Sequence, residues 1–371
     1  MTSAETLRAR APIAARAVLA DGRGGFGVRA IEIDAPGPEE VRVRIGASGV
    51  CHTDLDHLRA WYDVPTVLGH EGAGTVVDVG DDVIGVRPGD RVVLNWAIPC
   101  GRCFFCRDGA EHLCEARPVV APEKRRADGR PLPASFGLGT MATHALVPRS
   151  AVVTTTVDVP MTSACIVGCA VATGFCSAVN AARVAPDETV AVIGVGGVGL
   201  NVVQGARYAG AGRIVAVDVE PRKLEFARVF GATDVVLASR DDDGLAAAAV
   251  EVRALFDGRG ADVAFECTAI PRLGAAPLAM VRNGGRALGV SGIEQIVPID
   301  MQLFEWDKTY LNPLYGQCSP RRDIPRILGL YATGALRLDE LVTCTYALDD
   351  VARAFDDLEL GVNAKGVLVT A

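Results

Sequence analysis

The stretch TVAVIGVGGVGLNVVQ, residues 189–204, constrains the fold of this chain more than any other feature. A buried apolar run leads into a G-x-G-x-x-G turn, and a pattern typical of a helix follows the turn. Gly194 permits the tight turn, Gly196 lets the backbone approach a pyrophosphate, and Gly199 allows the helix to pack closely on the strand. Free N–H groups and the helix dipole favour an anion at such a helix start. The stretch therefore predicts a phosphate-binding turn formed by Gly194, Gly196, Gly197, Val198 and Gly199.

An acidic residue follows this turn at the distance expected of a dinucleotide site. Asp218 ends the next buried run, RIVAVD, 19 residues after Gly199. A carboxylate there accepts hydrogen bonds from the ribose hydroxyls and repels a 2′-phosphate, so the pattern favours NAD over NADP. Arg222 and Lys223 lie close by and would weaken that preference, and we include Lys223 among the cofactor-binding residues. In this context a purely structural glycine turn is the weaker interpretation.

The pattern of apolar and polar residues changes along the chain. Residues 12–50 and 66–95 contain short runs that alternate apolar and polar residues between Gly and Pro turns, which is typical of β-strands. From about residue 172, buried runs alternate with helical patterns, which is the signature of a doubly wound parallel sheet. The sequence thus predicts an α/β protein with a mostly-β domain over 1–171, a nucleotide-binding domain over 172–314 and a C-terminal segment over 315–371.

The bulk composition excludes several classes of protein. The chain carries a formal net charge of −8, whereas nucleic-acid binders usually present a basic face. The sequence has no apolar run near the roughly 20 residues that a bilayer span requires, and arginines interrupt the N-terminal segment where a signal peptide would be apolar. We expect a cytoplasmic enzyme that acts on a small molecule and binds neither nucleic acid nor a membrane.

Four of the eleven cysteines lie within one short loop, CGRCFFCRDGAEHLC. The odd count and the clustering fit metal binding and reduced thiols better than a disulfide framework. Four thiolates in such a loop suit tetrahedral zinc at a closed structural site, and an iron–sulfur cluster is the alternative that the spacing leaves open. The predicted ligands are Cys100, Cys103, Cys106 and Cys114.

A second group of metal-binding residue types is dispersed along the chain. Cys51 lies in GVCHTDLDHL, His70 and Glu71 lie in GHEGAG, and Cys169 lies in GCAVATG. Two thiolates and one imidazole form the ligand set of a catalytic zinc that keeps one position open for substrate. Spacing alone does not join residues so far apart, because single histidines and cysteines are more often structural.

These motifs together resemble the zinc-dependent medium-chain alcohol dehydrogenases. GVCHTDL, LGHEGAG, PGDRVV, the four-cysteine loop, GCAVATG, GVGGVGL and VAVDVE occur in the order of that family. Within it, the chain looks most like the class III and mycothiol-dependent formaldehyde dehydrogenase branch. The resemblance implies a GroES-like catalytic domain, a Rossmann domain for NAD, and a C-terminal segment that returns to the catalytic domain. It also implies two zinc ions per subunit, one catalytic and one structural, and so favours zinc over an iron–sulfur cluster in the loop.

The resemblance assigns roles to the dispersed group. The metal ligands that it implies are Cys51, His70 and Cys169, with Glu71 as a transient further ligand. Asp54 would hold the His70 ring through its free N–H and so fix the tautomer. Thr53 would place a hydroxyl against the metal-bound oxygen of the substrate.

Some positions depart from the family pattern. Many relatives that oxidise alcohols carry a histidine where this chain has Asp56, at the outer end of a proton relay. A free aspartate is a weak base at neutral pH. Three alternatives therefore stay open: Asp56 serves as the catalytic relay, His57 replaces it, or ribose hydroxyls and water suffice. His52 lies where relatives place a cation near the pyrophosphate, and Lys365 lies where they carry a phosphate-binding arginine.

The resemblance also places Tyr62, Trp96, Leu138 and Leu314 at positions that line the substrate pocket. The large indole of Trp96 should narrow that pocket. Ordinary core packing is the alternative for each of the four, because apolar residues are usually buried.

The implied reaction is hydride transfer between an alcohol and NAD, with an aldehyde or ketone reduced in the reverse direction. One alternative is a dehydrogenase for the formaldehyde adduct of mycothiol or glutathione, and another is a specialised biosynthetic reductase with an altered proton relay. Relatives assemble as dimers or tetramers, so we expect a homodimer or homotetramer with the segment 295–315 at the interface.

Overall fold

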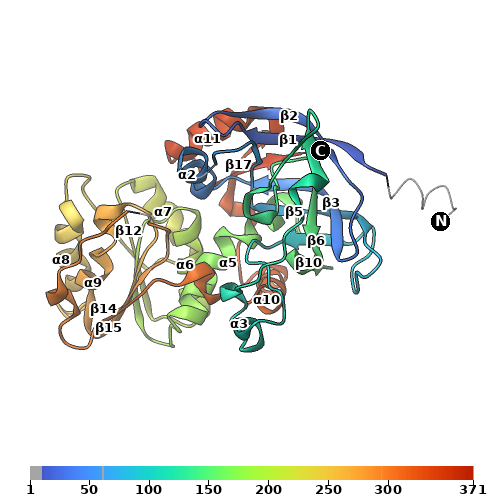
Figure 1. Cartoon of the computed structure of the whole chain (residues 1–371). Helices are drawn as coiled ribbons and strands as arrows, with labels where there is room; N and C mark the ends of the chain where they lie inside the picture. Colours follow the sequence, from blue (N-terminus) through green and yellow to red (C-terminus); the bar gives the residue numbers. More distant parts are fainter. Residues whose placement is uncertain (1–10, 61, 294, 371) are drawn as a thin grey trace. The chain divides into compact units, whose positions relative to one another are not determined.

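The computed structural model describes residues 11–60, 62–293 and 295–370, which fold into two compact units (Figure 1). One unit comprises the chain up to Cys169 together with the chain from Ser319 onward, and the other comprises Ala170–Cys318. The first unit ends at 169 where the sequence predicted 171, and the second ends at 318 where it predicted 314. Each unit is described by itself.

The first unit is built around two mostly antiparallel β-sheets. Its smaller sheet contains, in spatial order, β4 (Thr66–Val67), β1 (Ile13–Ala20), β2 (Phe26–Ile33), β7 (Arg125–Ala127) and β8 (Arg130–Pro131). Its larger sheet contains, in spatial order, β10 (Val152–Thr155), β6 (Arg91–Leu94), β5 (Glu71–Val79), β3 (Glu40–Gly49), β18 (Lys365–Val369) and β17 (Val342–Ala347), with β9 (His144–Pro148) also paired with β3. The helices of this unit are α2 (His52–Ala60), α3 (Phe104–Arg107), α4 (Met161–Cys165), α10 (Pro320–Ala332) and α11 (Val351–Glu359).

The last strand of the chain lies beside the strand that leads into the first metal-binding motif. β18 runs antiparallel to β3, with Val367 opposite Gly49. On its other edge β3 pairs with β5, and there Gly49 lies opposite Glu71. Figure 1 shows the red C-terminal elements β17 and α11 among the blue N-terminal strands. Strand pairing therefore gathers three segments that are far apart in the sequence.

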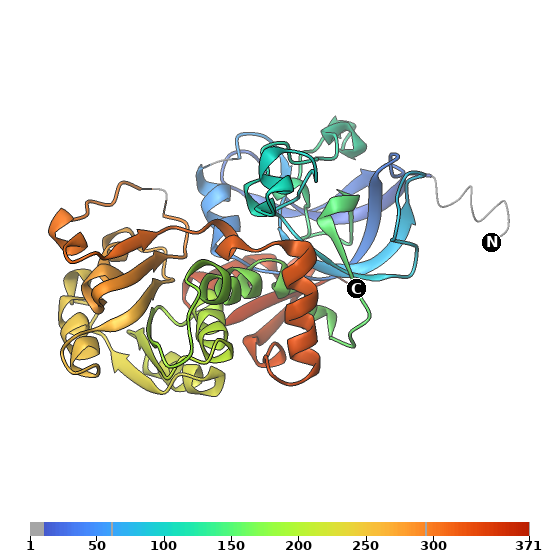
Figure 2. The same cartoon turned by 90° about the horizontal axis from the view of Figure 1, so that it is seen from below.

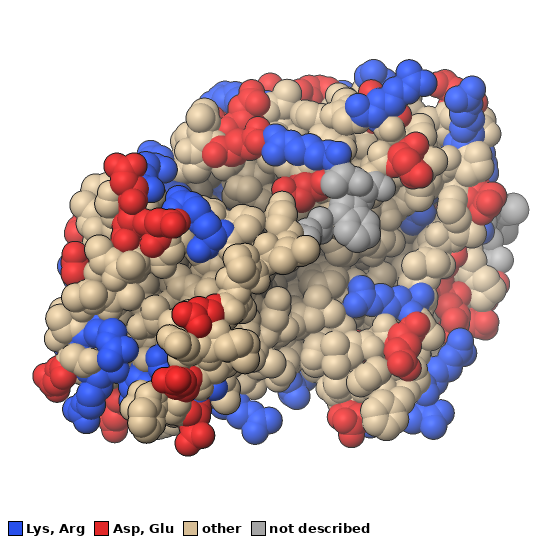
Figure 3. Space-filling view, turned by 60° about the vertical axis from the view of Figure 1, so that its left-hand side comes forward, with Lys and Arg blue, Asp and Glu red and all other residues tan. Residues whose placement is uncertain are grey.

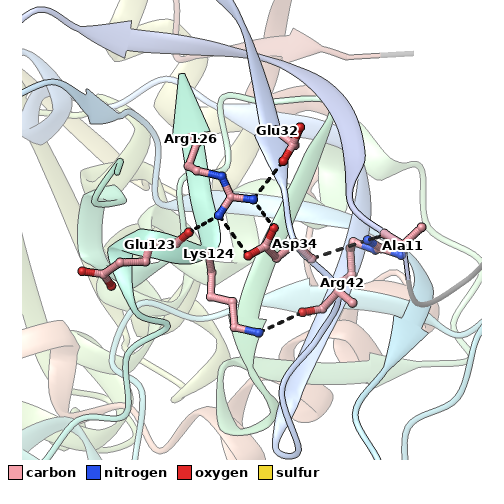
Figure 4. A network of polar contacts seen from close by, with 8 residues as sticks. Ala11, Glu32, Asp34, Arg42, Glu123, Lys124 and Arg126 are labelled. Carbon is pink, nitrogen blue, oxygen red and sulfur yellow. Dashed lines mark hydrogen bonds and ion pairs between the residues drawn. The ribbon is translucent and has the colours of Figure 1, made fainter. Parts of the chain in front are cut away.

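A polar network ties β2 to β7 and to the segment before β1 (Figure 4). Arg126 of β7 forms ion pairs with Asp34 and with Glu32. Arg42 of β3 is buried; it donates to the carbonyl oxygen of Ala11 at 2.9 Å and pairs with Asp78 at 3.0 Å. A buried guanidinium is tolerated only when its charge and donors are matched. The contacts of Arg42 therefore hold the segment before β1 against β3.

The second unit is a parallel sheet with helices on both faces (Figures 1 and 2). Its strands, in spatial order, are β13 (Asp234–Leu237), β12 (Arg213–Asp218), β11 (Thr189–Ile193), β14 (Ala261–Glu266), β15 (Val281–Gly289) and β16 (Thr309–Leu311). Its helices are α5 (Ala170–Cys176), α6 (Gly197–Tyr208), α7 (Pro221–Phe230), α8 (Ala246–Ala254) and α9 (Ala276–Met280). The order reverses between β11 and β14, as it does in a doubly wound sheet. The predicted fold class is confirmed.

Local sequence explains these elements. The strands β11 and β12 are buried runs of Val, Ile and Ala, which suits strands that are covered on both faces. Helix α7 begins with Pro221, which is pre-organised for a first helical turn. It ends at Gly231, whose φ of 118° lies in the left-handed region that glycine adopts without strain.

The visible surface shows no concentration of one charge. On the face drawn in Figure 3, Lys and Arg side chains are interspersed with Asp and Glu side chains. In the described ranges, no single helix is long and apolar enough to cross a membrane, although one bent pair of short helices passes the same test of length and composition.

Candidate metal centres and dinucleotide site

The dispersed metal-binding residues meet in the first unit. One ligand atom from each of Cys51, His70, Glu71 and Cys169 lies within 4.8 Å of the other three. Cys51 follows β3, His70 and Glu71 stand at the start of β5, and the pairing of these strands brings the two motifs together. His70 and Glu71 are buried, whereas the two cysteines are half-buried and form no disulfide. Two thiols and one imidazole are the donor set that zinc prefers, so these residues fit the ion.

Asp54 orients the imidazole of His70. The Nδ1 of His70 lies 3.0 Å from Oδ1 of Asp54, and each residue is 1% exposed. Burial alone would lower the pKa of His70, but the charge of Asp54 and hydrogen bonds to Asp54 and Cys51 raise it well above its usual value. Because the carboxylate can only accept, Nδ1 carries the hydrogen and Nε2 is left for the metal. The structure thus brings together the residues predicted for this contact.

The two thiols of the centre influence one another. A hydrogen bond from Cys169 holds the pKa of Cys51 well below its usual value despite burial, and His70 adds to the effect. The same bond, together with burial, raises the pKa of Cys169. A divalent cation would take both as thiolates.

Glu71 is held by an ion pair with Lys365. The Nζ of Lys365 lies 2.9 Å from the carboxylate of Glu71 and donates to the carbonyl oxygen of Val50 at 2.9 Å. Burial raises the pKa of Glu71 to about 7, although Lys365 opposes that rise. A Cβ on Gly49 would lie 2.0 Å from Oε2 of Glu71, so this carboxylate requires a glycine there. Lys365 is buried and its ammonium contacts both groups, and its predicted phosphate contact stays a prediction.

The polar residues of helix α2 differ in their exposure to solvent. Thr53 is half-buried, and its Oγ1 lies 3.7 Å from Sγ of Cys51. Asp56 and His52 are exposed on the same helix. The structure therefore brings Thr53 to the metal-binding group and leaves Asp56 and His52 at the surface. The catalytic role of Asp56 and the cofactor contact of His52 stay predictions.

An aromatic residue that the sequence analysis did not single out lies against this centre. The ring of Phe136 lies 4.8 Å from that of His70 and 5.4 Å from that of Trp96, and it stacks on His57 at 5.2 Å with an interplanar angle of 11°. Its φ of 51° is left-handed, which is uncommon for a bulky residue and suggests a functional constraint. The available signal was one aromatic residue in a glycine-rich loop, SFGLG.

The four residues predicted to line the pocket have different surroundings. Trp96 is half-buried beside Phe136, and the hydroxyl of Tyr62 is 2.7 Å from Oγ of Ser135, the residue before Phe136. Leu138 is completely buried in a hydrophobic cluster of the first unit, so its surroundings favour core packing. Leu314 belongs to the second unit and is 42% exposed. Trp96 itself packs against the hydrophobic cluster that contains Leu138.

The four-cysteine loop forms a compact ligand set of its own. The sulfurs of Cys100, Cys103, Cys106 and Cys114 lie within 4.8 Å of one another, and these cysteines form no disulfide. Backbone N–H groups of Arg102 and Cys103 donate to Sγ of Cys100 and lower its pKa to about 6. A thiolate stabilised in this way is prepared for a metal. All four ligand positions come from the protein, which is typical of a structural site.

The glycine turn of the second unit has the predicted shape. Gly194 has a φ of 81°, and a Cβ on Gly199 would lie 1.9 Å from the carbonyl oxygen of Gly194. A Cβ on Gly196 would meet no atom within 4 Å, so the space above the turn is open. Helix α6 begins at Gly197 and presents its free N–H groups at this turn. The turn therefore fits a pyrophosphate.

Asp218 lies at the end of β12 beside the turn. Its Oδ2 accepts the backbone N–H of Val195 at 3.0 Å, and its Oδ1 accepts that of Glu220 at 3.1 Å. The side chain is half-buried, as is Lys223 on the following helix. This is the place at which an acid would meet the adenosine ribose of NAD.

The chain is similar to proteins of known classes. Residues 37–160 match the family described as alcohol dehydrogenase GroES-like domain, and residues 197–332 match the zinc-binding dehydrogenase family. The chain is 36% identical to the NDMA-dependent alcohol dehydrogenase of Amycolatopsis methanolica, with 95% of this chain and 98% of that protein covered. It is 34% identical to the S-(hydroxymethyl)glutathione dehydrogenase of Saccharomyces cerevisiae, with 95% of each covered. The crystal structure of benzyl alcohol dehydrogenase from Acinetobacter calcoaceticus superposes with a TM-score of 0.87 at 29% identity, covering 97% and 100% of the two chains.

Proposed function

We propose how this chain carries out its reaction. The chain belongs to the zinc-dependent medium-chain alcohol dehydrogenase family and is an NAD-dependent enzyme of that family. The reaction is hydride transfer between a primary alcohol and NAD, with aldehyde reduction as the reverse. The observation that carries this assignment is the convergence of Cys51, His70 and Cys169, three ligands that leave one position for substrate.

Each residue of the first centre has a separate task. Bound zinc supplies a Lewis acid that lowers the pKa of the alcohol, and bound NAD supplies the hydride acceptor. The hydroxyl of Thr53, beside Cys51, accepts the proton that the alcohol gives up and passes it towards solvent. Asp54 keeps Nε2 of His70 free of hydrogen, so this nitrogen can bind the metal. Because Asp56 is exposed, we assign the onward proton transfer to water and ribose hydroxyls.

Lys365 balances the charge behind the metal site. Two thiolates neutralise one zinc ion, and Glu71 would add a further negative charge. The ammonium of Lys365 compensates for that charge, because its Nζ lies 2.9 Å from the carboxylate of Glu71. We therefore propose that the role of Lys365 is its ion pair with Glu71, in place of a contact with a cofactor phosphate.

We propose aromatic primary alcohols as the substrate class. The support is the pair of rings, Phe136 and Trp96, which contact one another and lie beside the metal ligand His70. Flat apolar walls favour a planar aryl group, because aromatic rings gain both burial and stacking. The similarity to a benzyl alcohol dehydrogenase is consistent with this choice.

A second candidate substrate is the formaldehyde adduct of a thiol. One relative is an S-(hydroxymethyl)glutathione dehydrogenase. The guanidinium of Arg117 lies 5.7 Å from the centre of the Trp96 ring, where it could meet a carboxylate of the thiol. Both candidates use the same metal ligands, so only a substrate comparison separates them.

We further propose a second, structural zinc in the four-cysteine loop and a homodimer or homotetramer in the cytoplasm. The compact set of four sulfurs supports the second zinc, and the free cysteines support a reducing compartment. The assembly is supported by the position of β16 at the edge of its sheet and by the exposure of Met301 and Trp306 in the segment that leads to it. Light scattering tests the assembly, and the mass of a monomer would contradict it.

The experiment that tests the function follows NADH absorbance with purified, zinc-loaded protein. The panel contains benzyl alcohol, ethanol, and formaldehyde with mycothiol or with glutathione. Because one relative is named NDMA-dependent, a parallel series adds NDMA. Turnover of benzyl alcohol without thiol supports the proposal. Strictly thiol-dependent turnover would replace it by the second candidate.

A further inference from the structure

The end of β14 carries a buried acid that none of the roles above uses. Glu266 is the last residue of this strand and has no exposed surface. Its Oε1 accepts the backbone N–H of Thr268 at 2.5 Å and also contacts the Thr268 hydroxyl. Its Oε2 has no hydrogen-bond partner within the described ranges. A buried oxygen without a partner is costly, so a group from outside the folded chain is expected to meet it.

The cations and donors on the neighbouring strands are engaged elsewhere. On β15, Arg282 pairs with Asp262 at 2.6 Å and Arg286 pairs with Glu188 at 2.5 Å. On β16, the hydroxyl of Tyr310 donates to the carbonyl oxygen of Gly274 at 2.8 Å. Burial raises the pKa of Glu266, although hydrogen bonds from Thr268 oppose the rise. The chain therefore buries a carboxyl group and provides no counter-cation for it among the residues described.

Glu266 lies at the point where the sheet order reverses. It is paired with Ile193, the residue immediately before the glycine turn. A Cβ on Gly194 would lie 2.5 Å from the Thr268 side chain, so the segment after β14 lies directly against that turn. Ligands of open α/β sheets bind outside the carboxyl ends of the strands at this reversal. Asp218 ends a strand of one half of the sheet, and Glu266 ends the first strand of the other half.

We propose that Glu266 faces the nicotinamide half of the cofactor and strengthens the binding of oxidised NAD relative to NADH. The oxidised ring carries a positive charge and the reduced ring carries none, whereas the pyrophosphate and adenosine are the same in both. A buried carboxylate therefore attracts one redox form and not the other, and the attraction is strong because little water screens it. Glu266 is then a residue that determines specificity for the oxidation state of the cofactor. This inference rests on the proposed binding of NAD to the glycine turn.

The test measures the dissociation constants of NAD+ and NADH by calorimetry for the wild type and for E266Q, which keeps the shape and removes the charge. We expect E266Q to raise the Kd for NAD+ about tenfold and to change the Kd for NADH by less than about twofold, a difference of about 1.4 kcal/mol. The matched control is D262N, which removes a carboxylate from the opposite end of the same strand. In D262N the ratio of the Kd for NAD+ to the Kd for NADH should stay within about twofold of the wild-type ratio.

Other results would overturn the inference. If E266Q weakens NAD+ and NADH equally, Glu266 has only a structural role. If E266Q does not fold, the ratio of the Kd for NAD+ to the Kd for NADH is measured for E266D, whose carboxylate is withdrawn by one methylene. An unchanged ratio in E266D also overturns the inference. A shift of about threefold in favour of NADH supports it. A wild type that binds neither NAD+ nor NADH contradicts the proposed function itself, and this result is seen before any variant is compared.

Discussion

Asp54→Asn tests how the first metal centre is organised. The pair of Asp54 and His70 has a separation of 3.0 Å and each residue is 1% exposed, so solvent screens it little. Asn keeps the volume and an accepting oxygen but removes the charge. Hydrogen bonds to charged groups contribute about 1.5–3 kcal/mol and neutral ones about 0.5–1.5 kcal/mol. The loss should therefore be about 1.4 kcal/mol, which corresponds to about tenfold weaker zinc binding at this centre.

A chromophoric chelator that competes for zinc measures this effect. The four-cysteine loop is a separate ligand set that does not include His70, so its zinc should be released as in the wild type and provides an internal reference. The matched control is D56N, because Asp56 is an exposed carboxylate on the same helix two residues later. D56N should release zinc like the wild type. Unchanged zinc affinity in D54N, or equal losses in both variants, would refute the assignment of Asp54 to His70.

The remaining predictions concern the same unit. T53V should lower kcat about 100-fold at unchanged zinc content, whereas D56N should lower it less than about threefold; equal losses in steady-state assays would return Asp56 to the relay. K365M should lower the free energy of unfolding by about 3 kcal/mol in urea titrations, because it leaves Glu71 buried without its partner. The same variant should leave the Kd for NAD unchanged, and a large rise in Kd would restore the phosphate contact. F136A should raise KM for benzyl alcohol about tenfold and leave KM for ethanol unchanged; parallel changes would exclude an aryl subsite. C103S should lose one zinc ion per chain by elemental analysis and unfold at a lower temperature.

Much of the second unit could be predicted from the sequence. The glycine spacing and the buried runs around it are local signals, and the doubly wound sheet follows from their alternation with helices. The predicted family and fold class are confirmed by the two matched families and by the superposition on a benzyl alcohol dehydrogenase. The four-cysteine loop was equally accessible, because its ligands are neighbours in the chain.

The first metal centre could not be assembled from spacing. Cys51 and Cys169 are 118 residues apart, and they meet only because β3, β5 and the segment after α4 are packed together. Strand pairing of this range depends on the whole fold, so the resemblance to a family was needed to join these residues. Lys365 shows one limit of reading contacts from the sequence: its ion pair with Glu71 depends on the placement of β18 beside β3.

Phe136 shows a second limit. Its ring reaches His70 and Trp96 through a left-handed backbone conformation that apolar patterns do not predict. Leu138, two residues later, was one of the four expected pocket residues, and its side chain is completely buried in a hydrophobic cluster. In an irregular loop no periodicity tells which of two nearby apolar residues points towards a site.

The central claim is that Cys51, His70 and Cys169 hold a metal with one position open to substrate. The most direct test replaces zinc by cobalt(II) and records the visible and near-ultraviolet spectrum of the protein while benzyl alcohol is added in the presence of NAD. We predict two cobalt ions per chain, with the spectrum of one changing on addition of the alcohol and that one absent in H70A. A single cobalt ion held by the four-cysteine loop, or a spectrum that the alcohol does not alter, would contradict the account.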